Sequence, residues 1–161
     1  MLEDLRTSTC CCEQSFNPLQ WYGTHHSRSC LESLNRRSRV QILVVDDEPD
    51  IRDTMKVLLQ MHGHRVEVAA DGKQALELAI ERVPDLVFMD MKMPVMDGLT
   101  ATRLMRADDK MSKVPIVCIS AYLQQDDWRE KAMAAGCDDC LSKPVDTGRL
   151  RLVLSRYDTL H

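Results

Sequence analysis

The chain has 161 residues, 44% of them hydrophobic, which is enough for one ordinary domain with a packed core plus a tail. Its formal net charge of -4 gives no general electrostatic reason to bind nucleic acid or an anionic membrane. No apolar run is long enough to span a bilayer, and the acidic amino terminus is not followed by an apolar signal core, so we expect a cytoplasmic protein without a membrane partner.

Residues 1–38 differ in composition from the rest and are predicted to form a disordered tail. They are rich in Ser, Cys, Arg and Asn and show no sustained helical or strand period. They contain two groups of potential metal ligands: Cys10, Cys11, Cys12 and Cys30, with His25 and His26. Metal binding or palmitoylation here is an alternative, but three adjacent cysteines fit one tetrahedral site poorly and no CxxC spacing is present. Reduced thiols in a disordered tail are the favoured interpretation.

From residue 40 onward, short apolar runs alternate with amphipathic helical patterns. The runs favour strands, and in chain order they are 40–45, 66–68, 86–89, 116–119 and 140–141. Each run precedes a stripe of apolar residues at helical spacing: Ile51, Met55, Leu58 and Leu59; Ala75, Leu76, Ala79, Ile80 and Val83; Leu99, Leu104 and Met105; Trp128, Ala132 and Ala135; Leu150, Val153, Leu154 and Tyr157. We expect Asp47 or Glu48 to cap the first helix ahead of Pro49.

This alternation predicts an α/β fold, a doubly wound parallel sheet of five strands covered by helices on both faces. The runs at 40–45, 86–89 and 116–119 are apolar throughout and should be central, whereas the other two should lie at the edges. With right-handed crossovers, the strand order becomes 2-1-3-4-5, a flavodoxin-like (βα)5 arrangement. Ligands in such sheets bind beyond the carboxyl ends of the strands, where the winding direction reverses between strands one and three.

Polar side chains follow four of the five predicted strands: Asp46 and Asp47, Asp90, Ser120, and Lys143. Two carboxylates about 4 Å apart repel each other by about 4 kcal/mol at an effective dielectric constant near 20. Mg2+ accepts oxygen ligands, relieves this repulsion and shields an incoming phosphate, which leaves one carboxylate free to act as a nucleophile. Taken singly, these residues are more often caps, turn formers or solvated charges. Their placement on one rim makes the combined site the better interpretation.

Four segments, 42–49, 89–98, 119–121 and 136–144, make the sequence similar to the receiver domains of two-component response regulators. The resemblance covers about 120 residues and places the receiver domain at 39–158. It implies that Asp90 is the phosphorylated residue and that Asp46 and Asp47 hold Mg2+ together with Asp90. It also implies that the backbone carbonyl of Lys92 completes the metal shell.

The resemblance further implies that the hydroxyl of Ser120 and the amine of Lys143 stabilise the phosphoryl group, and that the Lys143–Pro144 bond is cis. The family usually has an aromatic residue three positions before this lysine, where the ring reports the switch. Cys140 stands there in this chain. We therefore expect a weakened link between phosphorylation and the output surface.

The function that follows is a phospho-acceptor, not a turnover enzyme, that receives its phosphoryl group from a histidine kinase or a histidine phosphotransfer protein. Its protein target would bind the face formed by the fourth helix, fifth strand and fifth helix. An aspartyl phosphatase is disfavoured because Asp46-Asp47-Glu48 lacks the acid spacing of those enzymes, and a degenerate receiver because all the acceptor residues are present. No DNA-binding output domain is expected, so the receiver either stands alone or belongs to a hybrid sensor kinase.

Overall fold

The computed structural model describes residues 40–122 and 126–157, and the predictions for the tail at 1–38 lie outside these residues. The described residues form five strands: β1 (Gln41–Val45), β2 (Arg65–Ala69), β3 (Leu86–Asp90), β4 (Ile116–Ser120) and β5 (Asp139–Ser142). Five helices alternate with them: α2 (Pro49–Met61), α3 (Gly72–Glu81), α4 (Gly98–Ala107), α5 (Asp126–Ala135) and α6 (Thr147–Tyr157). None of these helices is long and apolar enough to cross a membrane.

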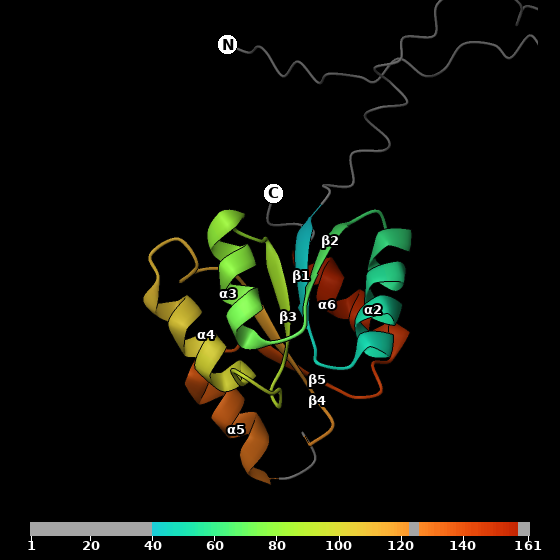
Figure 1. The fold of residues 1–161 in the computed structure, drawn as a ribbon. Helices are drawn as coiled ribbons and strands as arrows, with labels where there is room; N and C mark the ends of the chain where they lie inside the picture. The colour runs from blue at the N-terminus through green and yellow to red at the C-terminus, as the bar shows by residue number, and fades with distance from the viewer. Residues whose placement is uncertain (1–39, 123–125, 158–161) are drawn as a thin grey trace, which may run out of the picture. The chain divides into compact units, whose positions relative to one another are not determined.

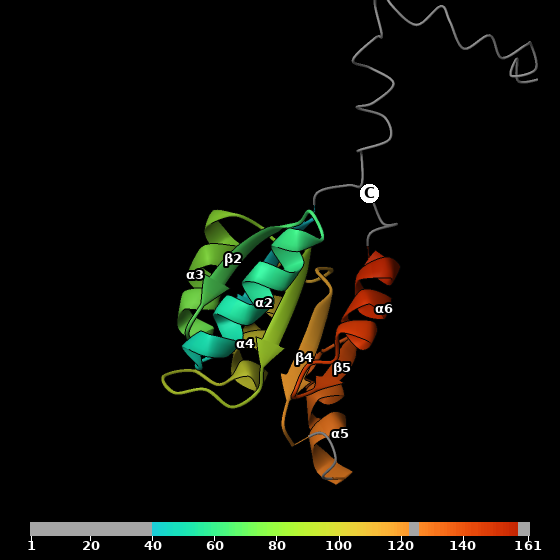
Figure 2. The ribbon, with the colours of Figure 1, turned by 90° about the vertical axis from the view of Figure 1, so that its right-hand side faces the viewer.

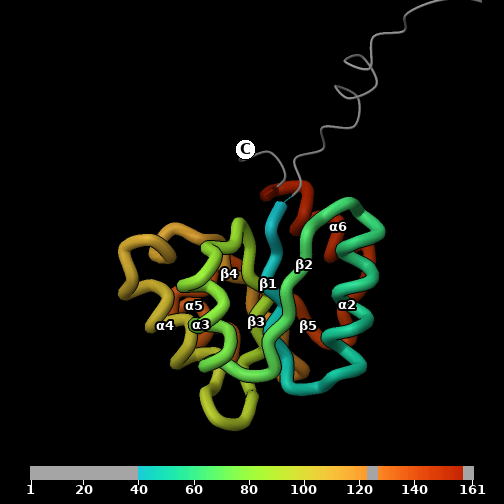
Figure 3. Tube along the Cα trace, turned by 45° about the horizontal axis from the view of Figure 1, so that its top comes forward, coloured from blue at the N-terminus to red at the C-terminus, as the bar shows by residue number. Residues whose placement is uncertain are grey.

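The five strands form one parallel sheet in the order β2-β1-β3-β4-β5, which confirms the predicted topology. Helices α2 and α6 cover one face of the sheet, and α3, α4 and α5 cover the other (Figures 1 and 3). Every residue of β3 and β4 is buried, whereas β2, at one edge, is only partly buried. The apolar runs therefore predicted correctly which strands are central.

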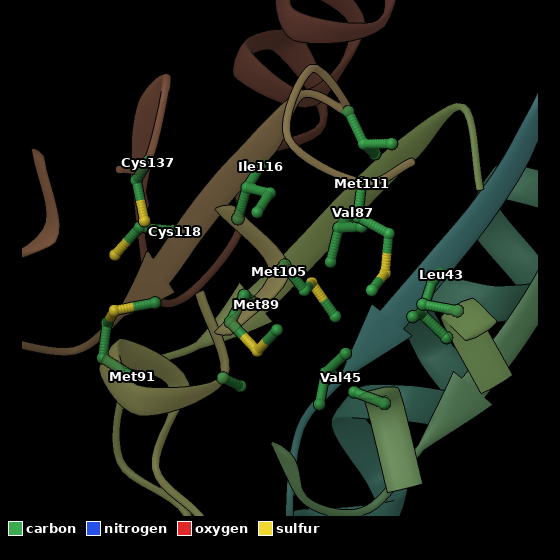
Figure 4. Packing of buried hydrophobic residues seen from close by; sticks show 14 of the residues in the cluster. Leu43, Val45, Val87, Met89, Met91, Met105, Met111, Ile116, Cys118 and Cys137 are labelled. Carbon is green, nitrogen blue, oxygen red and sulfur yellow. The ribbon is translucent and has the colours of Figure 1, made fainter. Parts of the chain in front are cut away.

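Each face of the sheet has its own hydrophobic core. The α2–α6 side is built mainly from branched side chains around Phe88, Ile42 and Leu59. The opposite side is rich in sulfur, and Figure 4 labels six residues that contribute it: Met89, Met91, Met105, Met111, Cys118 and Cys137. Methionine side chains are unbranched and flexible, so they fill irregular gaps between strands and helices. The packing of this core is therefore less constrained by side-chain shape than that of the core built from branched residues.

Three details of the helices differ from the sequence prediction. Glu48 takes the N-cap position of α2, but its side chain makes no capping hydrogen bond. Helix α3 ends at Glu81, so Val83 does not belong to it. Ile80 and Leu104 were assigned to the apolar stripes, yet their side chains are largely exposed. The helical period identifies the buried face only approximately, because the apolar stripe spans about 100° or more of the helix surface. Residues at the margins of the stripe, such as Ile80 and Leu104, can therefore face solvent.

The loop between β3 and α4 contains a strained residue next to the rim of the sheet. Val95 has a φ of 66° and is 82% exposed. A β-branched residue is an outlier in the left-handed region, where an L-residue costs roughly 1–2 kcal/mol. Because the side chain is exposed, packing does not compensate for this strain.

Replacing Val95 with asparagine, which tolerates the left-handed region, should therefore raise the free energy of unfolding by about 1 kcal/mol. Urea denaturation measures the change. Val57→Asn serves as the matched control, because Val57 is also exposed but lies within α2, where valine and asparagine differ little in helix propensity. A Val95→Asn protein no more stable than wild type would mean that the loop relaxes around valine at no cost.

Candidate functional site

The predicted site residues meet at the carboxyl ends of the strands. Val45 pairs with Met89 in the sheet, which brings the following residues, Asp46 and Asp90, to the same level at the ends of β1 and β3. Ser120, at the end of β4, pairs with Ser142, so Lys143 follows one step beyond. The ends of β3 and β4 lie at the same edge of the sheet (Figure 2). The winding direction of the chain reverses between β1 and β3, and ligands of such folds bind beyond the carboxyl ends of these strands.

Three carboxylates gather at this edge, as predicted. Asp46, Asp47 and Asp90 each offer an oxygen, and these oxygens all lie within 4.8 Å of one another. Asp46 and Asp90 are buried, at 1% and 5% exposure, whereas Asp47 is exposed. Burying like charges this close requires compensation by a cation, because their repulsion rises as water is excluded.

Lys143 supplies part of that compensation. Its Nζ lies 2.6 Å from Asp90 Oδ2 and 2.7 Å from Asp46 Oδ2. Burial favours the neutral amine, but the contacts with both carboxylates outweigh it and raise the pKa of Lys143 above its usual value. Glu48 Oε1 lies 3.8 Å away, at the rim of the same cluster. The sequence interpretation treated Glu48 only as a helix cap, because its position before Pro49 matches that role equally well.

Asp90 is held at the centre of the site from several directions. Its Oδ2 accepts a hydrogen bond from Lys143, and its Oδ1 accepts one from the amide of Lys92 at 3.2 Å. Burial raises the pKa of Asp90 above its usual value, although Lys143 and the Lys92 amide offset part of this effect. A carboxylate with a fixed orientation and a nearby cation suits a nucleophile aimed at a phosphoryl group.

Ser120 connects the site to an aromatic cluster that sequence reasoning missed. The buried hydroxyl of Ser120 accepts a hydrogen bond from the amide of Tyr122 at 3.1 Å. The ammonium of Lys92 lies 3.8 Å from the centre of the Tyr122 ring and 5.1 Å from that of Trp128. Such contacts depend on loop geometry, so the spacing of Lys92, Tyr122 and Trp128 carried no signal in the sequence.

Comparison with known proteins identifies this arrangement. Residues 42–155 match the family profile of the response regulator receiver domain. The chain belongs to the response-regulator receiver family. It is 34% identical over 124 residues to the DNA-binding dual master transcriptional regulator RpaA of Synechocystis, an alignment that covers 74% of this chain and 51% of RpaA. This receiver chain therefore spans about half the length of that relative.

Solved receiver structures share the fold. The chemotaxis protein CheY4 of Vibrio cholerae is 30% identical with a TM-score of 0.70, and the match covers 74% of this chain and 99% of CheY4. The receiver domain of the sensor histidine kinase PA1611 from Pseudomonas aeruginosa is 38% identical with a TM-score of 0.68, covering 74% and 97% of the two chains. The PA1611 structure has a magnesium ion coordinated in its active site cleft.

The donors of this receiver also fit a hard divalent cation. Asp46 Oδ2 is buried and pairs with Lys143 Nζ at 2.7 Å, and no other donor among the described residues satisfies it, so it keeps a lone pair for a metal. An all-oxygen set of carboxylates, one of them exposed to water, is what Mg2+ prefers when it retains part of its hydration shell. The backbone carbonyl of Lys92 as a further ligand stays a prediction.

The remaining family expectations concern the end of β5. The Lys143–Pro144 peptide bond is cis, as the resemblance implied. Cys140 lies in β5 with 8% exposure, paired in register with Cys118 of β4. Its side chain belongs to the core cluster beneath α3, α4 and α5. Cys140 stands where the resemblance implied an aromatic ring, so its effect on switching stays a prediction.

Proposed function

We propose that this receiver accepts a phosphoryl group on Asp90 in a two-component phosphorelay, with Mg2+ bound by Asp46, Asp47 and Asp90. The observation that carries the proposal is the contact of Asp90 with Lys143 at 2.6 Å beside two further carboxylates. This combination provides a nucleophile, a cation for the incoming charge and ligands for a metal at one point.

Each residue has a distinct task in the proposed reaction. The Asp90 carboxylate forms an oxygen–phosphorus bond as the nitrogen–phosphorus bond of a phosphohistidine donor breaks. Lys143 moves from Asp90 Oδ2 to pair with a phosphoryl oxygen, and the hydroxyl of Ser120 leaves the Tyr122 amide to donate to another. Mg2+, when bound, would neutralise charge on the transferring group. Asp46 and Asp47 would hold it, and the backbone carbonyl of Lys92 would complete its shell.

The partners in this proposal are a histidine kinase or histidine phosphotransfer protein as donor, and a protein target on the face formed by α5, β5 and α6. The receiver acts as a phospho-acceptor rather than a turnover enzyme, and the cytoplasmic location expected from the sequence is part of the proposal. The same chemistry serves a receiver that stands alone and one attached to a sensor kinase.

Phosphotransfer profiling tests the proposed function. Purified histidine kinases or phosphotransfer proteins from the source organism, loaded with labelled phosphate, should transfer label to this chain within seconds to minutes for the cognate donor. The product should be a stoichiometric acyl phosphate that is labile to base and hydroxylamine. Steady turnover of a small phosphate monoester, with no retained label, would instead favour the aspartyl phosphatase.

The residue at position 140 provides a separate prediction about signal output. The Cys140 side chain has no ring that could turn inward when the receiver switches. Cys140→Tyr should therefore enlarge the phosphorylation-dependent change in amide protection at α5 and β5, while the rate of phosphorylation stays near wild type. Phosphorylation shifts the receiver between its inactive and active arrangements only through interactions that differ in free energy between them. A ring at position 140 contributes more to that difference than a thiol does. Amide hydrogen exchange with and without beryllofluoride measures the change in protection.

Cys137→Tyr is not a suitable control, because Cys137 is more deeply buried. Cys140→Ala is the better one: it keeps a small side chain and should behave like wild type. If wild type already shows a large protection change and Cys140→Tyr adds nothing, another residue carries the switch.

A further inference from the structure

Two buried cysteines lie side by side within the sheet, in the neighbouring strands β4 and β5. Cys118 in β4 and Cys140 in β5 are register partners in the parallel sheet. Side chains of register partners point to the same face, and both residues belong to the core cluster beneath α3, α4 and α5. Neighbouring strands lie about 4.7–4.9 Å apart, which is within the roughly 4.4–6.8 Å between Cα atoms that a disulfide spans.

The two thiols differ in reactivity. Cys140 is 8% exposed, and its pKa is lowered, first by a hydrogen bond with Cys118, although burial opposes this, and further by the charge of Arg129. Cys118 is fully buried, and the same hydrogen bond and its burial raise its pKa. Cys140 keeps some exposure and the lowered pKa, so it is the thiol that an oxidant reaches first, with the fully buried Cys118 directly beside it.

The third cysteine of this core provides a contrast. Cys137 lies in the turn between α5 and β5, where burial raises its pKa to about 11. Its Sγ contacts Thr102 Oγ1 at 3.9 Å. Cys137 precedes β5 and lies outside the residues of β5 that pair in register with β4. It serves as an internal control for thiol reactivity in the same cluster.

We propose that Cys140 and Cys118 are an oxidation site that hydrogen peroxide converts into a disulfide between β4 and β5. The Cys140 thiolate attacks one peroxide oxygen, the oxygen–oxygen bond breaks, and the released hydroxide takes up a proton to become water, which leaves a sulfenic acid. Cys118 then attacks the Cys140 sulfur, and the sulfenic hydroxyl leaves as water with the Cys118 proton. Overall, two thiols are oxidised and one peroxide is reduced to two waters.

The position of this bond gives it a consequence for the site, which rests on the proposed function. Cys118 precedes Ser120 by two residues, and Cys140 precedes Lys143 by three. A disulfide between Cys118 and Cys140 joins β4 to β5. It limits how far the β4 end that carries Ser120 can move relative to Cys140, the residue at the switch position. The oxidised receiver should therefore show a smaller beryllofluoride-dependent change in amide protection at α5 and β5 than the reduced one, and dithiothreitol should restore the change.

The site itself is tested on the full chain in its native state. The protein is treated with hydrogen peroxide, free thiols are blocked with iodoacetamide, and peptides are mapped by mass spectrometry without reduction. We expect a cross-linked pair of the Cys118 and Cys140 peptides that has lost two hydrogen atoms. Cys118→Ala and Cys140→Ala should each lose this product completely, whereas Cys137→Ser, which removes the other thiol from the Cys140 peptide, should retain it.

Oxidation confined to the tail cysteines, a link from Cys118 to Cys137, or accumulation of sulfinic acid on Cys140 without a cross-link would each overturn the inference. The two proposals fail separately. A cross-link in a protein that no phosphodonor modifies would sink the phospho-acceptor function alone, and efficient phosphorylation of a protein that forms no cross-link would sink the oxidation site alone.

Discussion

Replacing Asp90 with asparagine is expected to abolish phosphorylation by acetyl phosphate in the presence of Mg2+. The amide has nearly the shape of the carboxylate but lacks the anionic oxygen that attacks phosphorus. It also removes one of the three carboxylates that gather at the strand ends and one of the two that lie nearest Lys143 Nζ. Neither loss can be repaired by Asp46 or Asp47, since the attacking oxygen must approach the phosphorus in line with its leaving group.

The measurement is intact mass spectrometry, which should show one added phosphoryl group on wild type and none on Asp90→Asn. Asp71→Asn is the matched control, because Asp71 caps α3 through two backbone amides and asparagine also caps helices. It should be phosphorylated like wild type. Equal modification of Asp90→Asn and wild type would place the phosphorylation elsewhere and sink the assignment.

The topology could be predicted from the sequence because the five apolar runs differ in kind. Those that became β1, β3 and β4 are apolar on both faces, which only central strands of a covered parallel sheet require. The partly polar runs could then only be edges, and right-handed crossovers left one order. The same reasoning brought Asp46 and Asp90 to one rim, since strand ends in a parallel sheet meet at a common edge.

What the sequence could not predict depends on side-chain direction and loop conformation. The ion pair of Lys143 with two carboxylates at once follows from the way the chain leaves β5, and the contact of Lys92 with Tyr122 follows from two loops that approach in space. Val95 carries no local signal for a positive φ, because valine is a residue that avoids it. The register of Cys118 with Cys140 likewise requires the alignment of β4 and β5, which apolar runs alone do not fix.

Mg2+ is expected to stabilise the folded receiver, because it binds the native arrangement of carboxylates and finds no such arrangement in the unfolded chain. Binding to the native state alone adds RT ln(1 + [L]/Kd), so a concentration of about 100 Kd should raise the free energy of unfolding by about 2.7 kcal/mol. Without the metal, Lys143 balances Asp46 and Asp90, so the cation must share these oxygens with an ammonium. This competition with Lys143 weakens the affinity for Mg2+. The free energy of unfolding still depends on the Mg2+ concentration in the same way, with a larger Kd.

Asp47→Ala is the informative variant for this prediction. Asp47 is exposed, so removing its carboxylate takes a ligand from the metal without uncovering a buried charge. The variant should melt near the wild-type temperature in EDTA and should lose most of the rise that Mg2+ produces in wild type. Asp109→Ala removes an exposed carboxylate between α4 and β4, at the opposite end of the sheet, and should respond to Mg2+ like wild type. An unchanged melting temperature in wild type would show that the three carboxylates do not form the metal site. An equal rise in wild type, Asp47→Ala and Asp109→Ala would show the same, because a general effect of salt on surface charge acts on all three proteins alike.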